Sequence, residues 1–257
     1  MKKSALLIII LFAVNSLYSQ YINPVDRKVY TDTTLTTLFT GELLVNYENG
    51  HTKNKWNYKN GVIDGESILY YENGQIFHKW NYIDGVPQGE SVQYYENGQI
   101  KEKGFYVKGI GEGEFCQYME NGRIKEKGSY IQGKKDGTHL VYYDNGHVHI
   151  KKNYNQGLLE GESYIFNTDG KIEKKEKIIN GEYQGESIIY YANGTIRQTL
   201  NYINGVPDGD VVFYNVKGVI FKKETYKNGI LHGEVVTYTK KGKVKDKLIY
   251  VNGLLKN

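Results

Sequence analysis

Acidic side chains recur in this sequence at a spacing that could support chemistry. Eight carboxylates each follow a glycine at a fixed interval: Glu42, Glu66, Glu90, Glu114, Glu162, Glu186, Asp210 and Glu234. Paired carboxylates act as acid and base in glycoside hydrolysis, but eight equivalent copies favour a structural role, such as accepting hydrogen bonds where a strand starts. The sequence contains no nucleophile elbow with a Ser/His/acid set, no glycine-rich phosphate loop and no HExxH. We therefore predict that the protein is not an enzyme and uses no cofactor.

Histidine and cysteine offer a second kind of chemistry. His139, His147 and His149 lie close together at alternating positions, so one face of a hairpin could present three imidazoles to Zn²⁺ or another transition metal. No carboxylate of the same parity supports them, and we favour chance clustering on a solvated face and assign no metal site. Cys116 is the single cysteine; it cannot pair within the chain, and we expect it to be a small buried hydrophobe.

Lysine and tyrosine columns are the candidates for binding. The lysine column could attract anionic glycans, lipid headgroups or an acidic protein, although solvation of an outer face is the explanation we favour. Tyrosines flanked by lysine and asparagine offer amphipathic contact area for a protein or a sugar, although some will simply pack across strands. The candidate binding surface consists of Tyr47, Tyr71, Tyr95, Lys55, Lys79, Lys103, Asn57 and Asn81.

These columns arise from an internal repeat of constant length. Glycine recurs at steps of 24 residues from Gly41 to Gly233, giving nine copies without insertion or deletion. The average copy reads G-E-s-I-x-Y-Y-e-N-G-q-I-k-x-K-x-n-Y-x-x-G-v-x-x, and we number its positions 1 to 24. The 25 tyrosines and 30 glycines fit many short strands separated by turns, and 39% hydrophobic residues exclude a disordered chain.

Each copy predicts one β-hairpin. Positions 2 to 7 form a first strand, Glu-Asn-Gly is a strong hairpin turn, and a second strand ends near position 18. A longer turn such as Asp84 to Gln88 then returns the chain. A three-residue tip loop with a G1 bulge would place position 6 opposite position 12, and position 4 opposite position 14.

This register predicts what each face of the sheet carries. One face would hold the Ile/Val, Tyr and Trp columns, and the other Ser at position 3, Tyr at 7 and Lys at 15. A single hairpin is not stable alone, so stacked neighbours must bury each other's aromatic columns, with stability a sum of nearest-neighbour terms. Twist should curl the aromatic face inward.

The ends of the chain predict its organisation. Residues 1–20 have two lysines, a continuous run of ten apolar residues and a polar exit, which is the form of a secretory signal peptide. We expect an exported protein, periplasmic or secreted, without a transmembrane span after cleavage. Removing this segment lowers the net charge from +4 by two, which argues against a nucleic-acid partner. Residues 21–40 would be a lead-in and N-terminal cap, 41–257 the nine repeats, and the last copy a polar C-terminal cap.

The repeat resembles a known family. Tyr94 to Lys101 reads YYENGQIK, and Tyr106 to Gly109 continues the pattern; both resemble the bacterial variant of the MORN repeat, as in chains named YwqK-family toxin–antitoxin antitoxins. The resemblance covers about 41–257. It implies an all-β, elongated antiparallel β-hairpin solenoid with a single twisted sheet. It also implies scaffolding, protein binding or proposed lipid binding rather than catalysis.

Three functions follow as expectations. The leading one is an exported, non-enzymatic repeat scaffold that binds a protein partner in the envelope or outside the cell. A glycan or cell-envelope binding module is the first alternative. An antitoxin or immunity-type protein is the second, as the resemblance implies, although an antitoxin against a cytosolic toxin should lack an export signal.

Overall fold

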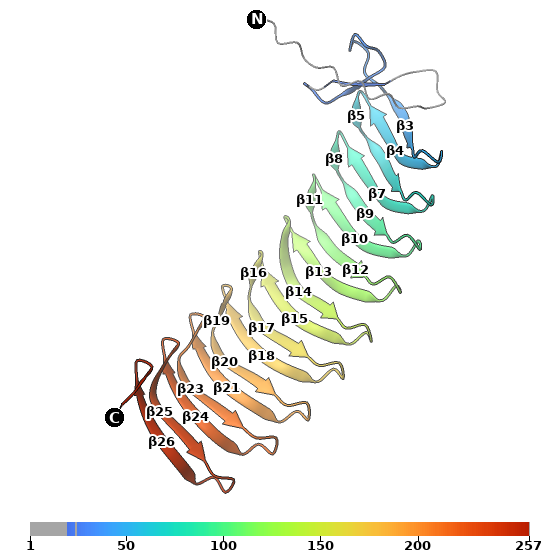
Figure 1. Cartoon of the computed structure of the whole chain (residues 1–257). Helices are drawn as coiled ribbons and strands as arrows, with labels where there is room; N and C mark the ends of the chain where they lie inside the picture. The colour runs from blue at the N-terminus through green and yellow to red at the C-terminus, as the bar shows by residue number, and fades with distance from the viewer. Residues whose placement is uncertain (1–19, 24, 257) are drawn as a thin grey trace, which may run out of the picture. The chain divides into compact units, whose positions relative to one another are not determined.

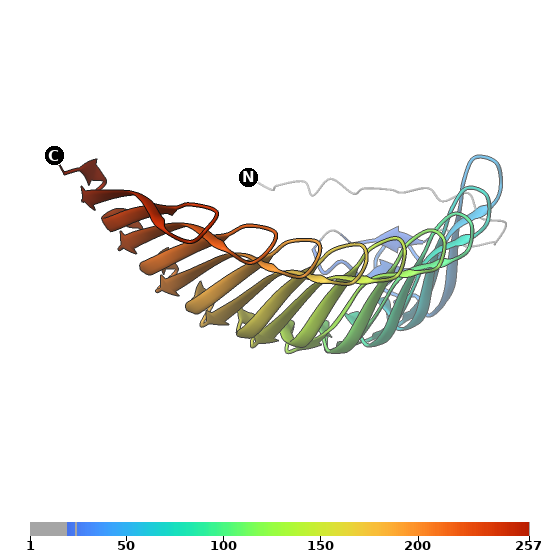
Figure 2. The same cartoon turned by 90° about the horizontal axis from the view of Figure 1, so that it is seen from below.

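The computed structural model describes residues 20–23 and 25–256, and its regular elements are all β-strands (Figure 1). The predicted signal peptide lies outside these residues except for Gln20. No helix in the described part of the chain is long and apolar enough to cross a membrane. The chain divides into two compact units, one ending at Arg123 and the other starting at Ile124. Within each unit the hairpins stand side by side in chain order (Figure 2).

The first unit contains twelve strands. They are β1 (Tyr21–Ile22), β2 (Val29–Tyr30), β3 (Gly41–Asn46), β4 (Thr52–Lys59), β5 (Val62–Ile63), β6 (Gly65–Tyr70), β7 (Ile76–Ile83), β8 (Val86–Pro87), β9 (Gly89–Tyr94), β10 (Ile100–Val107), β11 (Ile110–Gly111) and β12 (Gly113–Tyr118). The hairpins β3–β4, β6–β7 and β9–β10 are antiparallel, and adjacent hairpins join through β4–β6, β7–β9 and β10–β12.

The second unit contains fifteen strands. They are β13 (Ile124–Ile131), β14 (Lys134–Tyr142), β15 (Val148–Asn155), β16 (Leu158–Leu159), β17 (Gly161–Phe166), β18 (Ile172–Ile179), β19 (Glu182–Tyr183), β20 (Gly185–Tyr190), β21 (Ile196–Ile203), β22 (Val206–Pro207), β23 (Gly209–Tyr214), β24 (Ile220–Lys227), β25 (Ile230–Tyr238), β26 (Val244–Val251) and β27 (Leu254–Leu255). In neither unit does a described pairing join the first strand of the sheet to the last, so both sheets are open. The predicted all-β fold of antiparallel hairpin repeats is confirmed.

The tip of each hairpin is the predicted three-residue loop. In the second copy the amide of Gly74 donates to the Tyr71 carbonyl at 3.0 Å, and the amide of Tyr71 donates to the Gln75 carbonyl at 2.8 Å. Gly74 has a φ of 85°, a left-handed conformation that glycine adopts without a steric cost. The G1-type tip is therefore confirmed, and Tyr70 faces Ile76 as expected of positions 6 and 12.

The register beyond the tip differs from the prediction. Leu69 faces His78 and Ile68 faces Lys79, so position 4 lies opposite position 15 rather than 14. The cause is a second bulge, which leaves Phe77 at position 13 without a partner across the hairpin. The same shift occurs in seven other copies, for example between Val141 and Tyr142. The extra residue reverses the parity of everything that follows it on the second strand.

The expected distribution of side chains between the two faces is therefore wrong in part. Lys at position 15 shares a face with the apolar residue at position 4, whereas Ser67 at position 3 lies opposite Trp80 at position 16. Position 3 is the most buried column and not a solvated one. It comprises Leu43, Ser67, Ser91, His139, Ser163, Ser187, Val211 and Val235 among the buried residues. A small side chain suits this column where a large ring faces it, as Trp80 faces Ser67.

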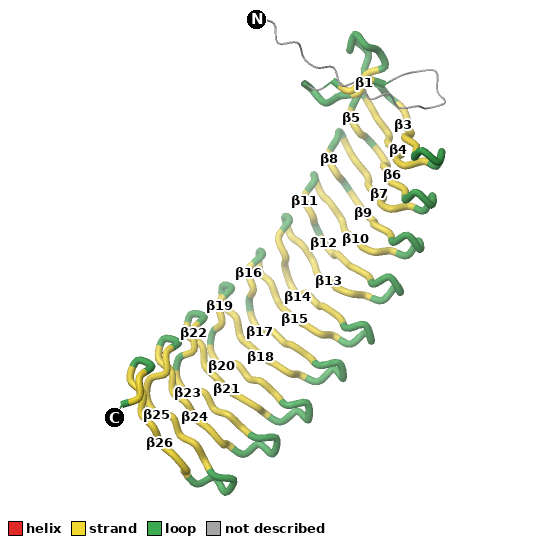
Figure 3. The backbone as a smooth tube through the Cα atoms, in the orientation of Figure 1, coloured by secondary structure: helices red, strands yellow, loops and turns green. Residues whose placement is uncertain are grey.

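The opposite end of each hairpin is a tight two-residue turn rather than the longer turn predicted (Figure 3). Asp84 and Gly85 have φ values of 48° and 79°, and two successive left-handed residues define a type I′ turn. Val86 and Pro87 then form β8 and pair with Ile83 and Tyr82. This end of the hairpin, which we call the rim, recurs in every copy with a left-handed residue at position 20 and glycine at position 21.

The two ends of the array are built differently. In the lead-in, the carbonyl of Phe39 accepts a hydrogen bond from Gly61 at 2.7 Å, and the Thr40 hydroxyl accepts one from Asn60 at 2.9 Å. Residues 39 and 40 thus occupy the places of positions 23 and 24 of a preceding copy. The ninth copy is not the polar cap we expected, because Leu248, Ile249 and Leu254 are exposed.

Candidate binding surfaces

The tyrosines at position 7 hold neighbouring hairpins together at their tips. The hydroxyl of Tyr47 donates to the carbonyl of Tyr70 at 2.7 Å, Tyr71 to Tyr94 at 2.9 Å, and Tyr95 to Tyr118 at 2.8 Å. The second unit repeats this bond with Tyr143 and Tyr191. Burial raises the pKa of Tyr71 and of Tyr143, which keeps these phenols protonated and able to donate.

Asparagine at position 9 adds a second bond at each of these tips. Asn49 donates from Nδ2 to the Glu72 carbonyl at 3.3 Å, and its Oδ1 accepts from the amide of His51 at 2.9 Å. Asn73, Asn97, Asn145 and Asn193 make the same bond to the next copy. We call the paired tyrosine and asparagine bonds the tip latch. Three predicted binding residues, Tyr47, Tyr71 and Tyr95, belong to it, so their hydroxyl groups are committed to the array.

The lysines of the predicted surface are paired with carboxylates. Lys55 lies 2.6 Å from Glu42, Lys79 lies 2.5 Å from Glu66, and Lys103 lies 2.6 Å from Glu90. The hydrogen bond to each carboxylate raises the pKa of these lysines. The second bulge creates these ion pairs, because it places positions 2 and 15 on one face. Six of the eight acidic residues at position 2 pair with the lysine at position 15, and this pairing leaves less charge to attract an anion.

The predicted asparagines lie between these ion pairs and the rim. Asn57 donates from Nδ2 to the Glu66 carbonyl at 2.6 Å, which ties the first copy to the second. Asn81 lies opposite Glu66 in the β6–β7 hairpin. The structure thus brings the eight predicted residues together in the first unit in two groups, the tyrosines at the tips and the lysines with the asparagines on one face. A binding role for them stays a prediction.

The three histidines of the fifth copy do not converge. His139 is buried, its Nε2 lies 2.9 Å from the Ser129 carbonyl oxygen, and burial lowers its pKa. His147 lies at the tip, with Nδ1 at 2.7 Å from the Thr168 carbonyl. His149 stacks on Tyr143 with ring centroids 4.3 Å apart. In the portion of the chain that the structure describes, no group of three metal-ligating side chains could hold a metal ion.

A compact aromatic and polar cluster in the first unit was not predicted. The imidazole of His78 stacks on Trp80 with centroids 3.5 Å apart, and its Nε2 lies 2.8 Å from the Ser91 hydroxyl. Burial lowers the pKa of His78 to about 4, so the ring is neutral at pH 7. A serine hydroxyl beside a neutral imidazole is also the arrangement of a nucleophile and its general base. The sequence supplied no motif for this contact because it joins two different copies.

A row of acceptors at position 24 was also missed. Asp64, Gln88, Glu160, Gln184 and Asp208 each accept a hydrogen bond from the position 20 amide of the next copy, as do Asp136 and His232. The signal was present, since this position carries a side chain able to accept in the first eight copies. The residue type at position 24 differs from copy to copy, so the average repeat shows no preferred residue there.

The largest feature that the sequence analysis overlooked is an exposed apolar stripe along the rim. Positions 19 and 22 face each other across the type I′ turn, as in Ile83↔Val86 and Ile203↔Val206. Their side chains point out of the sheet into solvent. We call this set the rim stripe: Ile83, Val86, Val107 and Ile110 in the first unit, and Ile131, Leu158, Ile179, Ile203, Val206, Ile230, Val251 and Leu254 in the second. Contiguous exposed apolar surface marks an interaction site.

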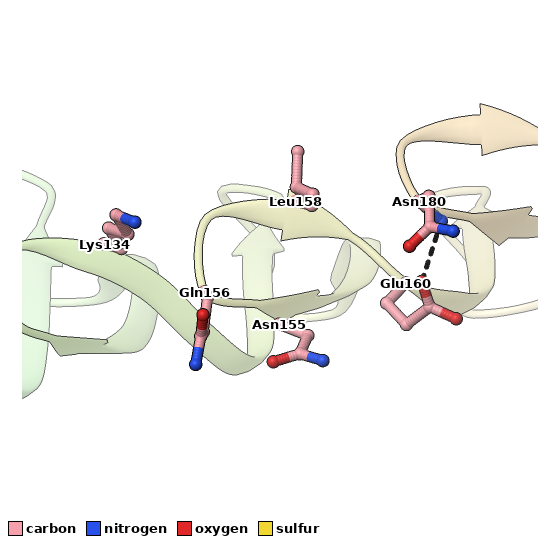
Figure 4. A pocket seen from close by; sticks show the side chains of 6 residues that line it. All are labelled: Lys134, Asn155, Gln156, Leu158, Glu160 and Asn180. Atoms are coloured by element: carbon pink, nitrogen blue, oxygen red, sulfur yellow. Dashed lines mark hydrogen bonds between the residues drawn. The ribbon is translucent and has the colours of Figure 1, made fainter.

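The stripe of the second unit is interrupted by an open polar cleft of about 510 Å³ (Figure 4). Lys134 and Asn155 replace apolar residues of the stripe, and Gln156, Leu158, Glu160 and Asn180 complete the lining. Figure 4 shows the Glu160 carboxylate turned toward the backbone of Asn180, whose amide donates to it at 2.8 Å. Its lining is mainly polar and offers side-chain amides, an ammonium group and a carboxylate to a bound side chain.

Comparison with known proteins identifies the repeat. The model of the MORN repeat variant matches residues 39–60, 63–84, 87–108, 135–156 and 183–204. No curated protein matches the chain. The matched copies are the first, second, third, fifth and seventh, which are the copies whose tips carry the latch tyrosine and asparagine.

Solved structures that match include an alternansucrase in complex with isomaltononaose, at 15% identity and a TM-score of 0.22, covering 84% of this chain and 18% of that one. The TcdB2–TccC3 structure matches at 14% identity and 0.21, covering 92% and 16%. Its complex with Cdc42 matches at 14% and 0.21, covering 90% and 15%. The chain thus spans less than a fifth of these proteins, and TM-scores this low support no functional argument.

Proposed function

Because five copies of this chain match the MORN repeat variant, we propose that the protein is an exported, non-enzymatic scaffold that binds a protein partner along its rim stripe. The observation that carries this proposal is the exposure of large aliphatic side chains in successive copies, including Ile83 at 54% and Leu158 at 55%. Residues of this kind are normally buried. Repetition at one site per hairpin would let many weak contacts add up.

The tip tyrosines and the lysines of the predicted surface have few polar groups left for a ligand, which also favours the rim. The tip tyrosines donate to the backbone of the next copy, and the lysines are paired with carboxylates. Both therefore have less to offer a ligand than the rim has. Export is proposed from the sequence of residues 1–20, and the partner would accordingly be an envelope or extracellular protein.

Capture of the partner by matched variants tests the proposal. A rim variant carries Ile203→Asp and Val206→Asp, which places two charges in the stripe. A tip variant carries Ala192→Asp and Val216→Asp, which makes the same change in charge at exposed tip positions of the seventh and eighth copies. Proteins captured from envelope fractions by the wild type and the tip variant, but not by the rim variant, would be partners. Their direct binding would then be measured with purified proteins. Equal capture by both variants would refute a rim site.

A further inference from the structure

The rim stripe has a period that restricts what can lie along it. Each copy contributes two strands, and strands are about 4.8 Å apart, so equivalent side chains recur about every 9.6 Å. The turns are in close succession: a Cβ on Gly229 would lie 3.8 Å from Val206, and one on Gly253 would lie 3.5 Å from Ile230. The stripe of the second unit is thus a regular series of apolar steps.

One backbone conformation matches this period better than the others. A polyproline II segment has three residues per turn and a rise of 3.1 Å, so every third side chain points the same way at about 9.3 Å. Seven residues of α-helix span about 10.5 Å. In a β-strand, the side chain three positions further along points to the opposite face. Over four copies the accumulated mismatch is about 1 Å for polyproline II and about 4 Å for a helix.

The polar cleft adds a charge requirement. Lys134 makes no ion pair with any described residue, in contrast to six of the eight lysines at position 15. The Glu160 carboxylate in the cleft accepts the Asn180 amide. The ammonium group of Lys134 suits a carboxylate, and the side-chain amides of Asn155 and Gln156 line the same cleft.

We propose that the partner of the second unit is an extended polyproline II segment with an apolar side chain at every third position and an acidic residue seated over Lys134. The apolar residues would lie against Leu158, Ile179, Ile203 and Ile230 and the stripe residues beside them. This inference rests on the proposed function and specifies the chemistry of the partner.

Synthetic peptides test this inference against the full-length chain. The probe is Glu-Pro-Pro followed by four Leu-Pro-Pro units, labelled for fluorescence anisotropy. One control peptide has the same composition with its leucines moved off the three-residue period, and another is an amphipathic helix with leucine at every seventh position. We expect the probe to bind, and the permuted peptide to bind at least about tenfold more weakly.

Variants locate the contact. Ile203→Asp with Val206→Asp should weaken the probe about tenfold, while the tip variant Ala192→Asp with Val216→Asp should not. Lys134→Glu should weaken the probe, and replacing its glutamate by lysine should restore binding to that variant. Circular dichroism of each variant checks that it is folded.

Three outcomes would overturn the inference: equal binding of the probe and the permuted peptide, binding of the helical peptide alone, or no binding of the probe. If the rim variant still loses captured proteins when the probe does not bind, the proposed function stands and only the extended-segment inference fails. If the rim variant captures the same proteins as the wild type and the probe does not bind, both fail.

Discussion

Gly128→Ala tests whether neighbouring copies are packed as closely as the structure indicates. Gly128 occupies position 16 of the fourth copy, and the ring of His139 from the fifth copy lies against it. An added Cβ would lie 2.6 Å from Cγ of His139 and closer still to its Nδ1. Ordinary contact begins near 3.4 Å. Since His139 is only 4% exposed, its ring has little room to retreat.

The expected cost follows from that overlap. Forcing an extra carbon into a packed site costs about 1–3 kcal/mol, so the free energy of unfolding should fall by that amount. Two variants provide controls. Gly104→Ala changes the same column where no atom lies within 4 Å of the new Cβ, and it should be neutral or slightly stabilising. In the double variant, His139→Ser restores the serine common at position 3, and Gly128→Ala should then cost little.

Urea unfolding followed by circular dichroism measures the wild type, the two glycine variants, His139→Ser and the double variant, compared only where the m-values agree. If Gly128→Ala costs no more than Gly104→Ala, or if its cost is unchanged by His139→Ser, the contact between these two copies is not as described.

Three further predictions concern the array. Tyr71→Phe should lower the free energy of unfolding by about 1 kcal/mol through loss of its bond to Tyr94, whereas Tyr70→Phe, which removes no described hydrogen bond, should not; equal urea midpoints would contradict the tip latch. Burial lowers the pKa of His78 to about 4 from an ordinary 6.5, so as the pH falls the unfolded chain takes up a proton at a higher pH than the folded chain. The free energy of unfolding should therefore fall as the pH drops from 6.5 to 4, and thermal melts of His78→Gln should show a weaker dependence on pH. Ser187→Ala should be neutral or stabilising by calorimetry, because the buried hydroxyl has no described hydrogen-bond partner; a loss above about 1 kcal/mol would contradict this.

The sequence was sufficient for the hairpin and its tip because both depend on local chemistry. The Asn-Gly pair requires a left-handed glycine, and Tyr70 facing Ile76 follows from that loop length. The second bulge could not be predicted in this way. It puts Lys79 opposite Ile68, and this lysine reaches Glu66 across the hairpin while its aliphatic stem lies beside Ile68. The predicted register placed position 4 opposite position 14, because a lysine opposite an apolar residue looked unfavourable. A lysine can nevertheless pack its aliphatic stem on the apolar residue and pair its ammonium group with a carboxylate.

The rim stripe was missed for a different reason. Positions 19 and 22 vary among Ile, Val and Leu and are occasionally charged, so they looked like part of a loop. Only the type I′ geometry of residues such as Asn204 and Gly205 shows that Ile203 and Val206 face each other on one side of the sheet. A column of variable aliphatic residues beside a constant glycine was the available signal.

The tip latch and the rim stripe are distributed differently among the copies. Copies that match the MORN variant carry the tip latch, whereas the sixth copy has Asn167 at position 7 and matches neither criterion. Yet the rim of that copy still exposes Ile179. The family pattern therefore follows the bonds that join hairpins, while the apolar rim is kept even where those bonds are absent. Joining hairpins alone requires no exposed aliphatic side chain at position 19, so its persistence in an unlatched copy favours a contact with another molecule.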